Sequence, residues 1–206
     1  MPKKRYLCTT YIALKGTCTQ KKNKKRDSMQ HPLHLFKHCP KCGSTEFGIN
    51  DEKSKKCAGC GFVYYINPLA ATVGIITDGK GRILVARRAK EPAMGTLDLP
   101  GGFSDSYETA EEGVAREILE ETGLKVTATR YLFSIPNTYI YSGMELHTMD
   151  LFFLCEVEDY SSLTANDDVD RLQWIEIEKL DSNEFGLQSI RKSIEIFKEL
   201  HNNNRL

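Results

Sequence analysis

Three glutamates near the middle of the chain, Glu117, Glu120 and Glu121, are spaced so that a helix would bring their carboxylates together. Residues three and four apart are neighbours on a helix surface, and like charges at these spacings repel each other. The repulsion is removed when the carboxylates share divalent cations, and hard oxygen ligands suit Mg²⁺ or Mn²⁺. The alternative interpretation is a solvated acidic face. The residues around the glutamates decide between the two.

The segment that carries these glutamates is predicted to be one amphipathic helix. Thr109 and Glu112 can form a capping box at its start, and Gly123 suits a left-handed residue at its end. Gly113, an unfavourable residue inside a helix, precedes Glu117 by one turn and would leave room for ions or a phosphate. The apolar stripe expected to pack on a core consists of Ala110, Val114, Ala115, Ile118 and Leu119.

The wider pattern resembles the Nudix box, the signature of the Nudix hydrolase family. That signature is Gly, five residues, Glu, seven residues and then Arg-Glu-U-x-Glu-Glu-x-Gly-U, where U is aliphatic. This chain fills every fixed position, with Gly102, Glu108, Arg116, Glu117, Ile118, Glu120, Glu121, Gly123 and Leu124. Chance is a poor explanation for so many specified residues at fixed spacing.

The resemblance implies catalytic Mg²⁺ or Mn²⁺ and a set of residues that bind it. The implied ligands are the carbonyl of Gly101 and the carboxylates of Glu117, Glu120 and Glu121, one of which is alternatively the base. Arg116 cannot lose its proton and is expected to orient a box glutamate by a forked ion pair. Glu108 is expected to be either an outer ligand or a partner of Arg116.

Two segments outside the box offer supporting candidates. An acidic loop precedes a strand near residue 172, and the resemblance implies an extra carboxylate there, as a ligand or a base; the candidates are Asp167, Asp168 and Asp170. Arg87 and Arg88 would point to opposite faces of a strand, so one of them, with Arg87 as the candidate, can reach a bound phosphate. Two surface arginines are the alternative.

Two Cys-x-x-Cys pairs predict a second metal site. Cys39 and Cys42 form one pair and Cys57 and Cys60 the other, each is followed by glycine, and 14 residues separate them. Four thiolates fill a tetrahedral site and leave no open position, so Zn²⁺ here is expected to be structural. Two matched pairs disfavour a redox site. The arrangement looks like a zinc ribbon, which would brace the next domain or bind a partner.

These motifs divide the chain into a basic leader at 1–28, a zinc ribbon at 36–66 and a Nudix domain at 67–206. The leader holds nine Lys or Arg and one acid, and we expect it to be disordered or dispensable. The resemblance implies an α/β (α+β) fold for the domain, an α/β/α sandwich around a mixed sheet. Its 40% hydrophobic content can supply the core of such a domain.

The expected elements of the domain follow from apolar periodicity. Strands are predicted at 70–77, at 82–88 as its hairpin partner, and at 125–133, 147–157 and 172–177. A terminal helix is predicted to pack on the core through Leu187, Ile190, Ile194 and Phe197. His147 and Cys155 are expected to be core residues of strands.

Composition narrows the protein class. No apolar run reaches the ~20 residues that span a membrane, the cysteine pattern favours a reducing compartment, and we expect a cytoplasmic protein. Because the part after the leader is mildly acidic, nucleic acid is a partner that is considered but not favoured. A homodimer is a further expectation from the family resemblance.

A four-cysteine ribbon followed by a Nudix domain resembles NADH pyrophosphatases. Their post-box Ser-Gln-Pro-Trp-Pro-Phe-Pro-x-Ser element is represented here only by Ser134 and Pro136. The expected function is therefore metal-dependent hydrolysis of ADP-ribose, NAD(H) or a nucleotide sugar, which releases a nucleoside monophosphate. The alternatives are a Nudix-fold ligand sensor without turnover and an enzyme that processes RNA caps.

Overall fold

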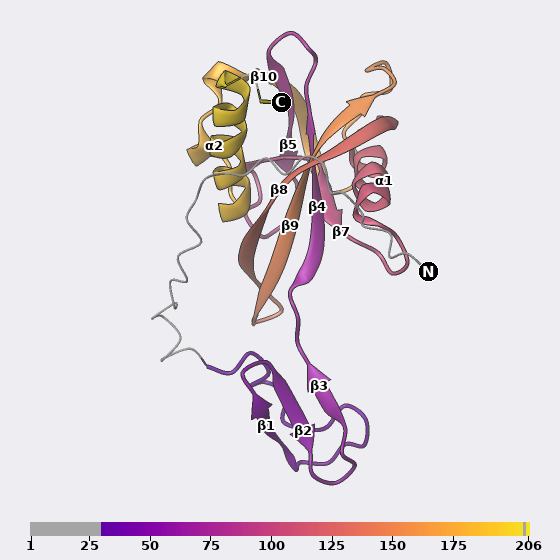
Figure 1. Ribbon diagram of the computed structural model, residues 1–206, viewed down its shortest axis with the longest axis vertical. Coiled ribbons are helices and arrows are strands. Elements are labelled where there is room, and N and C mark those ends of the chain that lie inside the picture. The colour runs from indigo at the N-terminus through magenta and orange to yellow at the C-terminus, as the bar shows by residue number, and fades with distance from the viewer. Residues whose placement is uncertain (1–29, 204) are drawn as a thin grey trace, which may run out of the picture.

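The computed structural model describes residues 30–203 and 205–206, so the basic leader lies outside the described residues. A small antiparallel sheet in the order β1-β2-β3 occupies one end of the molecule (Figure 1). Its strands are β1 (Phe47–Asp51), β2 (Ser54–Cys57) and β3 (Val63–Tyr65). The Nε2 atom of His31 lies 2.9 Å from the carbonyl oxygen of Asp51 at the end of β1.

Two further sheets form the body of the molecule, in the orders β7-β4-β9-β8 and β10-β5-β6. The first combines β4 (Leu69–Ile76), β7 (Gly101–Phe103), β8 (Val126–Tyr141) and β9 (Met144–Val157). The second combines β5 (Arg82–Arg88), β6 (Leu97–Asp98) and β10 (Val169–Glu176). Because β4 runs parallel to β9 and antiparallel to β7, the larger sheet is mixed, as expected.

The two helices cover opposite faces of the larger sheet (Figure 1). Helix α1 (Ala110–Thr122) packs through Val114 and Ile118 with Ile76, Phe153 and other apolar side chains on one face. Helix α2 (Gln188–Asn202) packs through Ile190, Ile194 and Phe197 on the other face. The predicted α/β/α sandwich and the core role of the terminal helix are both confirmed.

Glycine allows α1 to lie close to the sheet. A Cβ atom at Gly74 of β4 would lie 2.5 Å from Cδ1 of Ile118, so any side chain there would displace Ile118. The capping box of Thr109 and Glu112 and the left-handed Gly123 are present as predicted. Leu119, however, is 51% exposed, because α1 turns Glu121 rather than Leu119 towards the sheet. Its place in the apolar stripe was a wrong prediction.

The pairing of β4 with β5 was also predicted wrongly. The turn at Asp78 forms, with its backbone N–H donating to the carbonyl of Arg82, and a single bridge joins Thr77 to Ile83. Beyond that bridge the strands separate, since β4 pairs with β7 and β9 while β5 pairs with β6 and β10. The turn therefore carries the chain from one sheet to the other.

Strands β8 and β9 form one long hairpin around Ser142 and Gly143. The segment 134–139, which was predicted to lie between strands, continues β8 and pairs with residues 146–151. His147 has a 44% exposed side chain and is not a core residue, whereas Cys155 is buried as expected. Two 3₁₀ turns, Ile177–Lys179 and Ser182–Glu184, lead from β10 to α2. No helix of the described residues has the length and apolar character that crossing a membrane requires.

Candidate active site

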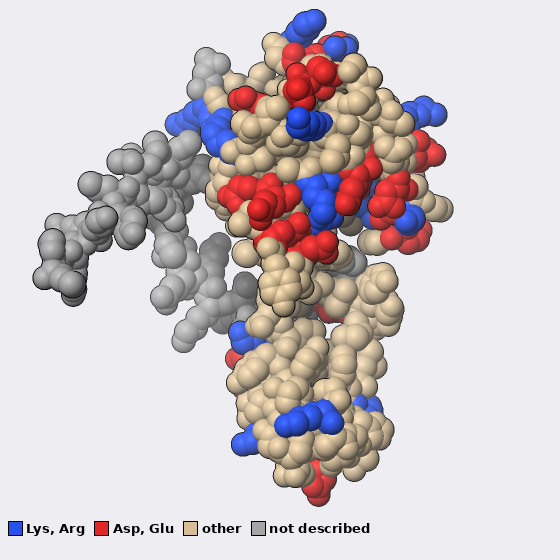
Figure 2. All heavy atoms as spheres, turned by 90° about the vertical axis from the view of Figure 1, so that its right-hand side faces the viewer, with Lys and Arg blue, Asp and Glu red and all other residues tan. Residues whose placement is uncertain are grey.

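Arg116 is the centre of the charged cluster on α1. Its Nε and Nη2 atoms donate to the two carboxylate oxygens of Glu108 at 3.1 and 2.8 Å, which is a forked ion pair. Its Nη1 atom donates to Glu117 at 2.8 Å and to Glu120 at 3.0 Å. The Arg116 guanidinium lowers the pKa of Glu108 to about 2, with help from the backbone N–H of Asp105. Figure 2, which faces the α1 side, shows acidic side chains gathered around basic ones.

Gly113 makes room for this cluster and not for an ion or a phosphate. A Cβ atom at Gly113 would lie 2.8 Å from Oε1 of Glu108, so the Glu108 carboxylate lies over the bare helix backbone. From this position Glu108 reaches Arg116, which in turn donates to the carbonyl oxygen of Phe103 at 3.0 Å. Of the two roles considered for Glu108, its contacts match the partner of Arg116.

Glu121 points away from this cluster and into the protein. It is only 8% exposed, and Oε2 accepts a hydrogen bond from the backbone N–H of Gly101 at 2.9 Å. The pKa of Glu121 is raised to about 8 by burial and by the charges of Asp98, Glu117 and Asp168, against the opposing effect of the Gly101 N–H. Burial also raises the pKa of Glu117. The three box glutamates therefore occupy different surroundings instead of one patch.

Two glycines bring β7 against α1 and β4. Gly101 has φ +151°, and a Cβ atom there would lie 2.1 Å from the carbonyl oxygen of Thr72. A Cβ atom at Gly102 would lie 2.5 Å from the carboxylate carbon of Glu117. Only glycine fits at Gly101, where a side chain would push on the backbone of β4, whereas a side chain at Gly102 would displace the Glu117 carboxylate. The spacing of the box thus follows from how closely its loop and helix approach.

The acidic side chains around Glu121 fit divalent cations. Glu117, Asp98 and Asp168 are all close enough to disfavour a charge on Glu121, and carboxylates repel one another unless a cation lies between them. Their oxygens are hard ligands of the type that Mg²⁺ and Mn²⁺ prefer. The backbone of Gly101, whose carbonyl is the predicted further ligand, contacts Glu121 through its N–H. Nudix hydrolases typically use these two metals, and the donor set agrees with them.

A cavity of about 260 Å³ opens beside Glu121. Gly101, Gly102 and Phe103 of β7 line it, as do Asp98 and Asp168, whose charges act on Glu121. Other lining residues come from β4, β5, β8, β9, β10, α2 and the connecting loops, among them Arg88, Asn137, Tyr141, Thr148, Asp150 and Leu187. Glu121 is therefore placed where a buried acid can act on a bound small molecule.

The structure places Arg88, rather than Arg87, at this cavity. The Nη1 atom of Arg88 donates to Oδ2 of the buried Asp98 at 2.5 Å, and its Nε atom donates to the carbonyl of Pro92 at 2.7 Å. Arg87 donates to the carbonyl of Gly95 instead. In the acidic loop, Asp168 lines the cavity, and both Asp167 and Asp168 form ion pairs with Lys90. Asp168 is therefore the better placed of the two acids.

Asp98, Asn137 and Asp150 are cavity residues that sequence reasoning missed. Asp98 stands between two leucines, and Asp150 stands between Met149 and Leu151 in a strand. A charged residue in an apolar strand is a sign of a buried polar site, and that sign was available. Nothing local distinguishes Asn137, because its burial depends on β9 and α2.

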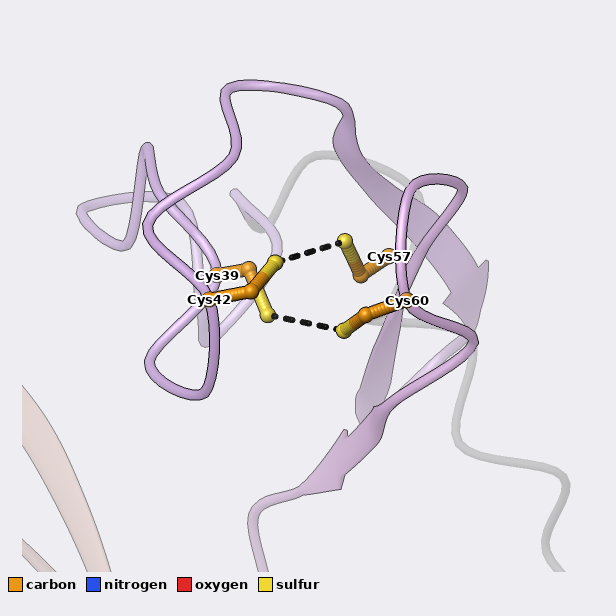
Figure 3. A group of neighbouring side chains, drawn as sticks. All are labelled: Cys39, Cys42, Cys57 and Cys60. Atoms are coloured by element: carbon orange, nitrogen blue, oxygen red, sulfur yellow. Dashed lines mark hydrogen bonds between the residues drawn. The ribbon is translucent and has the colours of Figure 1, made fainter.

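The four ribbon cysteines lie together as predicted. The Sγ atoms of Cys39 and Cys60 are 3.7 Å apart, and so are those of Cys42 and Cys57 (Figure 3). A tetrahedral ion with bonds of about 2.3 Å to sulfur places its ligands about 3.8 Å apart, whereas a disulfide needs about 2.05 Å. Among the described residues these cysteines are the only group of three or more possible metal ligands whose atoms all lie within 4.8 Å of one another.

The knuckle glycines have the backbone shape that this arrangement needs. Gly43 has φ +76° and Gly61 has φ +73°, and their N–H groups donate to the carbonyls of Cys39 and Cys57. Each knuckle is thereby closed into a tight turn that aims both thiols at one point. The arrangement fits one tetrahedral metal ion.

Comparison with known proteins agrees with this geometry. The NUDIX domain family model matches residues 67–195. An ADP-ribose pyrophosphatase from Methanocaldococcus jannaschii is 34% identical over 130 residues, which cover 62% of this chain and 73% of that protein. The NAD-capped RNA hydrolase NudC from Chromobacterium violaceum is 29% identical over 148 residues, which cover 72% of this chain but only 53% of NudC. The chain thus spans about half the length of its NudC relative.

Solved structures share the fold. A NUDIX hydrolase from Nitrosomonas europaea superposes with a TM-score of 0.63 at 20% identity, and the match covers 82% of this chain and 94% of that one. The family model, the relatives and the complete box on α1 agree. The chain belongs to the Nudix family, and its body is the domain of a Nudix-type pyrophosphohydrolase.

Proposed function

We propose that the chain hydrolyses the diphosphate bond of a nucleoside diphosphate linked to another group, releases a nucleoside monophosphate and requires Mg²⁺ or Mn²⁺. ADP-ribose is the first substrate to test, because a relative 34% identical over 130 residues is named an ADP-ribose pyrophosphatase. The observation that carries the proposal is the position of Glu121, buried at the cavity with its carboxylate on the backbone of Gly101. NAD(H) and nucleotide sugars are further members of the same substrate class.

Each box residue has a role in this proposal. Glu117, Glu120, Glu121 and the carbonyl of Gly101 would hold the cations. Bound divalent cations neutralise the diphosphate and lower the pKa of a coordinated water. Arg116 fixes Glu117 and Glu120 from one nitrogen, so removal of Arg116 releases two ligands at once. The same three glutamates are the candidates for the base, and Asp168 is the candidate for an added carboxylate at the cavity.

Product analysis with Mg²⁺ or Mn²⁺ tests the proposal. The panel consists of ADP-ribose, NADH, NAD⁺, nucleotide sugars and nucleoside triphosphates, and the variants are Glu117→Gln, Glu120→Gln and Glu121→Gln. Glu111→Gln is the matched control, because Glu111 is an exposed acid on the same helix and outside the cluster. We expect the wild type and the control to form a nucleoside monophosphate and the variants to lose this activity. Tight binding of one substrate with no product would favour the ligand-sensor alternative.

A second candidate function is the hydrolysis of NAD caps on RNA. The relative from Vibrio cholerae named NAD-capped RNA hydrolase NudC aligns over 160 residues, or 78% of this chain. The stretch from residue 67, where the family match begins, to the end of the chain is shorter than this alignment. The alignment therefore includes part of the ribbon. RNA binding that weakens with salt and with deletion of residues 1–28 would favour this function.

We also propose that the ribbon binds one structural Zn²⁺ through Cys39, Cys42, Cys57 and Cys60. The buried Cys39 and Cys57 form the small core of this module with Phe47, so the site and the fold of the ribbon depend on each other. The homodimer stays a prediction, which light scattering would test. The module boundaries at 36–66 and 67–206 are likewise proposed, and limited proteolysis would test them.

A further inference from the structure

Asn137 of β8 lies in the wall between two cavities. It lines the cavity beside Glu121, and with Thr148 it also lines a neighbouring cavity of about 490 Å³. The second cavity is bordered by Pro68, Ile135, Pro136, Thr138, His147, Gln188 and Lys192. A group bound at Asn137 would therefore contact the active-site cavity on one side and the second cavity on the other.

The carboxamide of Asn137 has no hydrogen-bond partner among the described residues. Asn137 is only 6% exposed, yet its side chain forms no hydrogen bond with another residue of the described chain, 30–203 and 205–206. A carboxamide has one acceptor oxygen and two N–H donors. The fully buried side-chain atoms without a partner among the described residues are Thr72 Oγ1 and Ser104 Oγ, so the amide atoms of Asn137 are open to the cavity that this residue lines. A ligand that brings both a donor and an acceptor can pair with them.

The strand geometry directs Asn137 towards the cavity and α2. Side chains alternate along a strand, so Asn137 lies on the same face as the core residue Ile135. Opposite Asn137, Thr148 donates to Oδ1 of Asp150 at 2.5 Å, and Ser189 of α2 donates to Oδ2 of Asp150 at 2.5 Å. Both neighbouring hydroxyls are thereby engaged. Asn137 is left as a free donor and acceptor at this end.

Acidic side chains line much of the cavity. Glu121, Asp98 and Asp168 suit cations and the diphosphate they carry, whereas both oxygens of Asp150 accept from the hydroxyls of Thr148 and Ser189. The carboxamide of Asn137 is uncharged and has both a donor and an acceptor. It therefore suits an uncharged ligand edge that presents an acceptor beside a donor. Adenine presents such a pair at its amino group and a ring nitrogen, and Asn is a common partner of that pair. The carboxamide of nicotinamide presents the same pair.

We propose that Asn137 determines specificity by pairing its carboxamide with a donor–acceptor edge on the base of the substrate. The inference rests on the proposed function for the identity of the substrate class. The shared chemistry is one N–H donor beside one acceptor, and it can come from adenine or from nicotinamide. Asn137 acts on recognition and takes no part in the chemical step.

Binding of uncleavable analogues tests this separately from hydrolysis. The probes are the α,β-methylene analogues of ADP-ribose and NAD⁺, their hypoxanthine counterparts, and the nicotinic acid counterpart of the NAD⁺ analogue, titrated by calorimetry with Mg²⁺. Hypoxanthine replaces the amino donor of adenine with a carbonyl acceptor, and nicotinic acid removes the donor of nicotinamide. We expect the wild type to prefer one natural base by roughly 10- to 100-fold, the range of a good paired contact. The arm that shows the preference identifies the base that Asn137 contacts.

The variants Asn137→Leu and Asn137→Asp supply the decisive comparison. Leu keeps the size and removes both polar groups, whereas Asp keeps an acceptor and removes the donor. Both variants are expected to lose the preference between paired probes, while Thr129→Val, on the same strand and outside both cavities, keeps it. Circular dichroism checks the folding of each variant. If Asn137→Leu unfolds the protein, the result with Asn137→Asp decides. An unchanged preference in a folded variant, or no preference in the wild type, overturns the inference. Absence of turnover with intact probe binding would instead count against the proposed function.

Discussion

Replacement of Gly113 by alanine separates helix propensity from the packing of the active site. In an ordinary exposed helix the change stabilises by about 1 kcal/mol, because alanine loses less backbone freedom on folding. Here the new Cβ atom would lie 2.8 Å from Oε1 of Glu108, tighter than an ordinary contact of 3.4 Å or more. The carboxylate must shift by several tenths of an ångström, and this weakens its fork with Arg116. We therefore expect the gain to vanish or reverse.

A double-mutant cycle isolates this effect. In a Glu108→Ala background nothing of Glu108 beyond its Cβ atom remains, so Gly113→Ala should stabilise by about 1 kcal/mol. In the wild-type background the same change should leave stability unchanged or lower it. The activity of Gly113→Ala should fall, because Arg116 holds Glu117 and Glu120.

Urea unfolding followed by fluorescence measures the cycle. The single tryptophan, Trp174, lies on β10 in the body of the protein, so its signal reports the Nudix domain and not the ribbon. Equal effects of Gly113→Ala in the two backgrounds would refute the packing of Glu108 over Gly113. A stabilised and fully active Gly113→Ala protein would refute the importance of this contact for the site.

Three further predictions follow from the same geometry. The pKa of Glu121 is raised from 4.5 to about 8, so its stabilising effect is present below pH 4.5 and is lost as the pH rises through about 8. The urea midpoint of the metal-free protein should therefore fall over this pH interval. Glu121→Gln should remove the part of the fall that is due to this carboxyl group. Gly102→Ala should displace the carboxylate of Glu117 and reduce kcat by about 100-fold with little change in Tm, and a normal kcat would contradict the close approach. Chelation of the ribbon metal, or Cys39→Ser, should disorder the ribbon as seen by NMR while the Trp174 signal persists; a shared loss of both would show that the two modules unfold together.

Local patterns predicted the parts of the site that are contiguous in sequence. Thr109, Glu112 and Gly123 bound α1 as expected, because caps depend on residues only a few positions apart. The two cysteine knuckles formed for the same reason, since each pair and its glycine define a turn. The bounds of β5, 82–88, were also predicted correctly from alternation and the preceding turn.

Residues that meet through long-range pairing escaped prediction. The partner of β4 is β9, more than 70 positions later, and only this pairing brings Asp150 beside Ala71 in the cavity wall. Asn137 is buried because β8 continues past the point where the local pattern suggested a loop. Arg88 reaches Asp98 because β5 pairs with β6. No local rule specifies these pairings, since burial against both helices decides them.

Phosphorus NMR of ADP-ribose with Mg²⁺ and the protein follows the proposed cleavage of the diphosphate itself. We expect the diphosphate resonances to be replaced by those of two phosphomonoesters, AMP and ribose 5-phosphate. The conversion should fail with Glu121→Gln and persist with Glu111→Gln. If the Glu121→Gln protein forms the monoesters at the wild-type rate, the assignment of the site is contradicted. If the wild type leaves the diphosphate resonances of every substrate in the panel unchanged, the proposed hydrolase activity is contradicted.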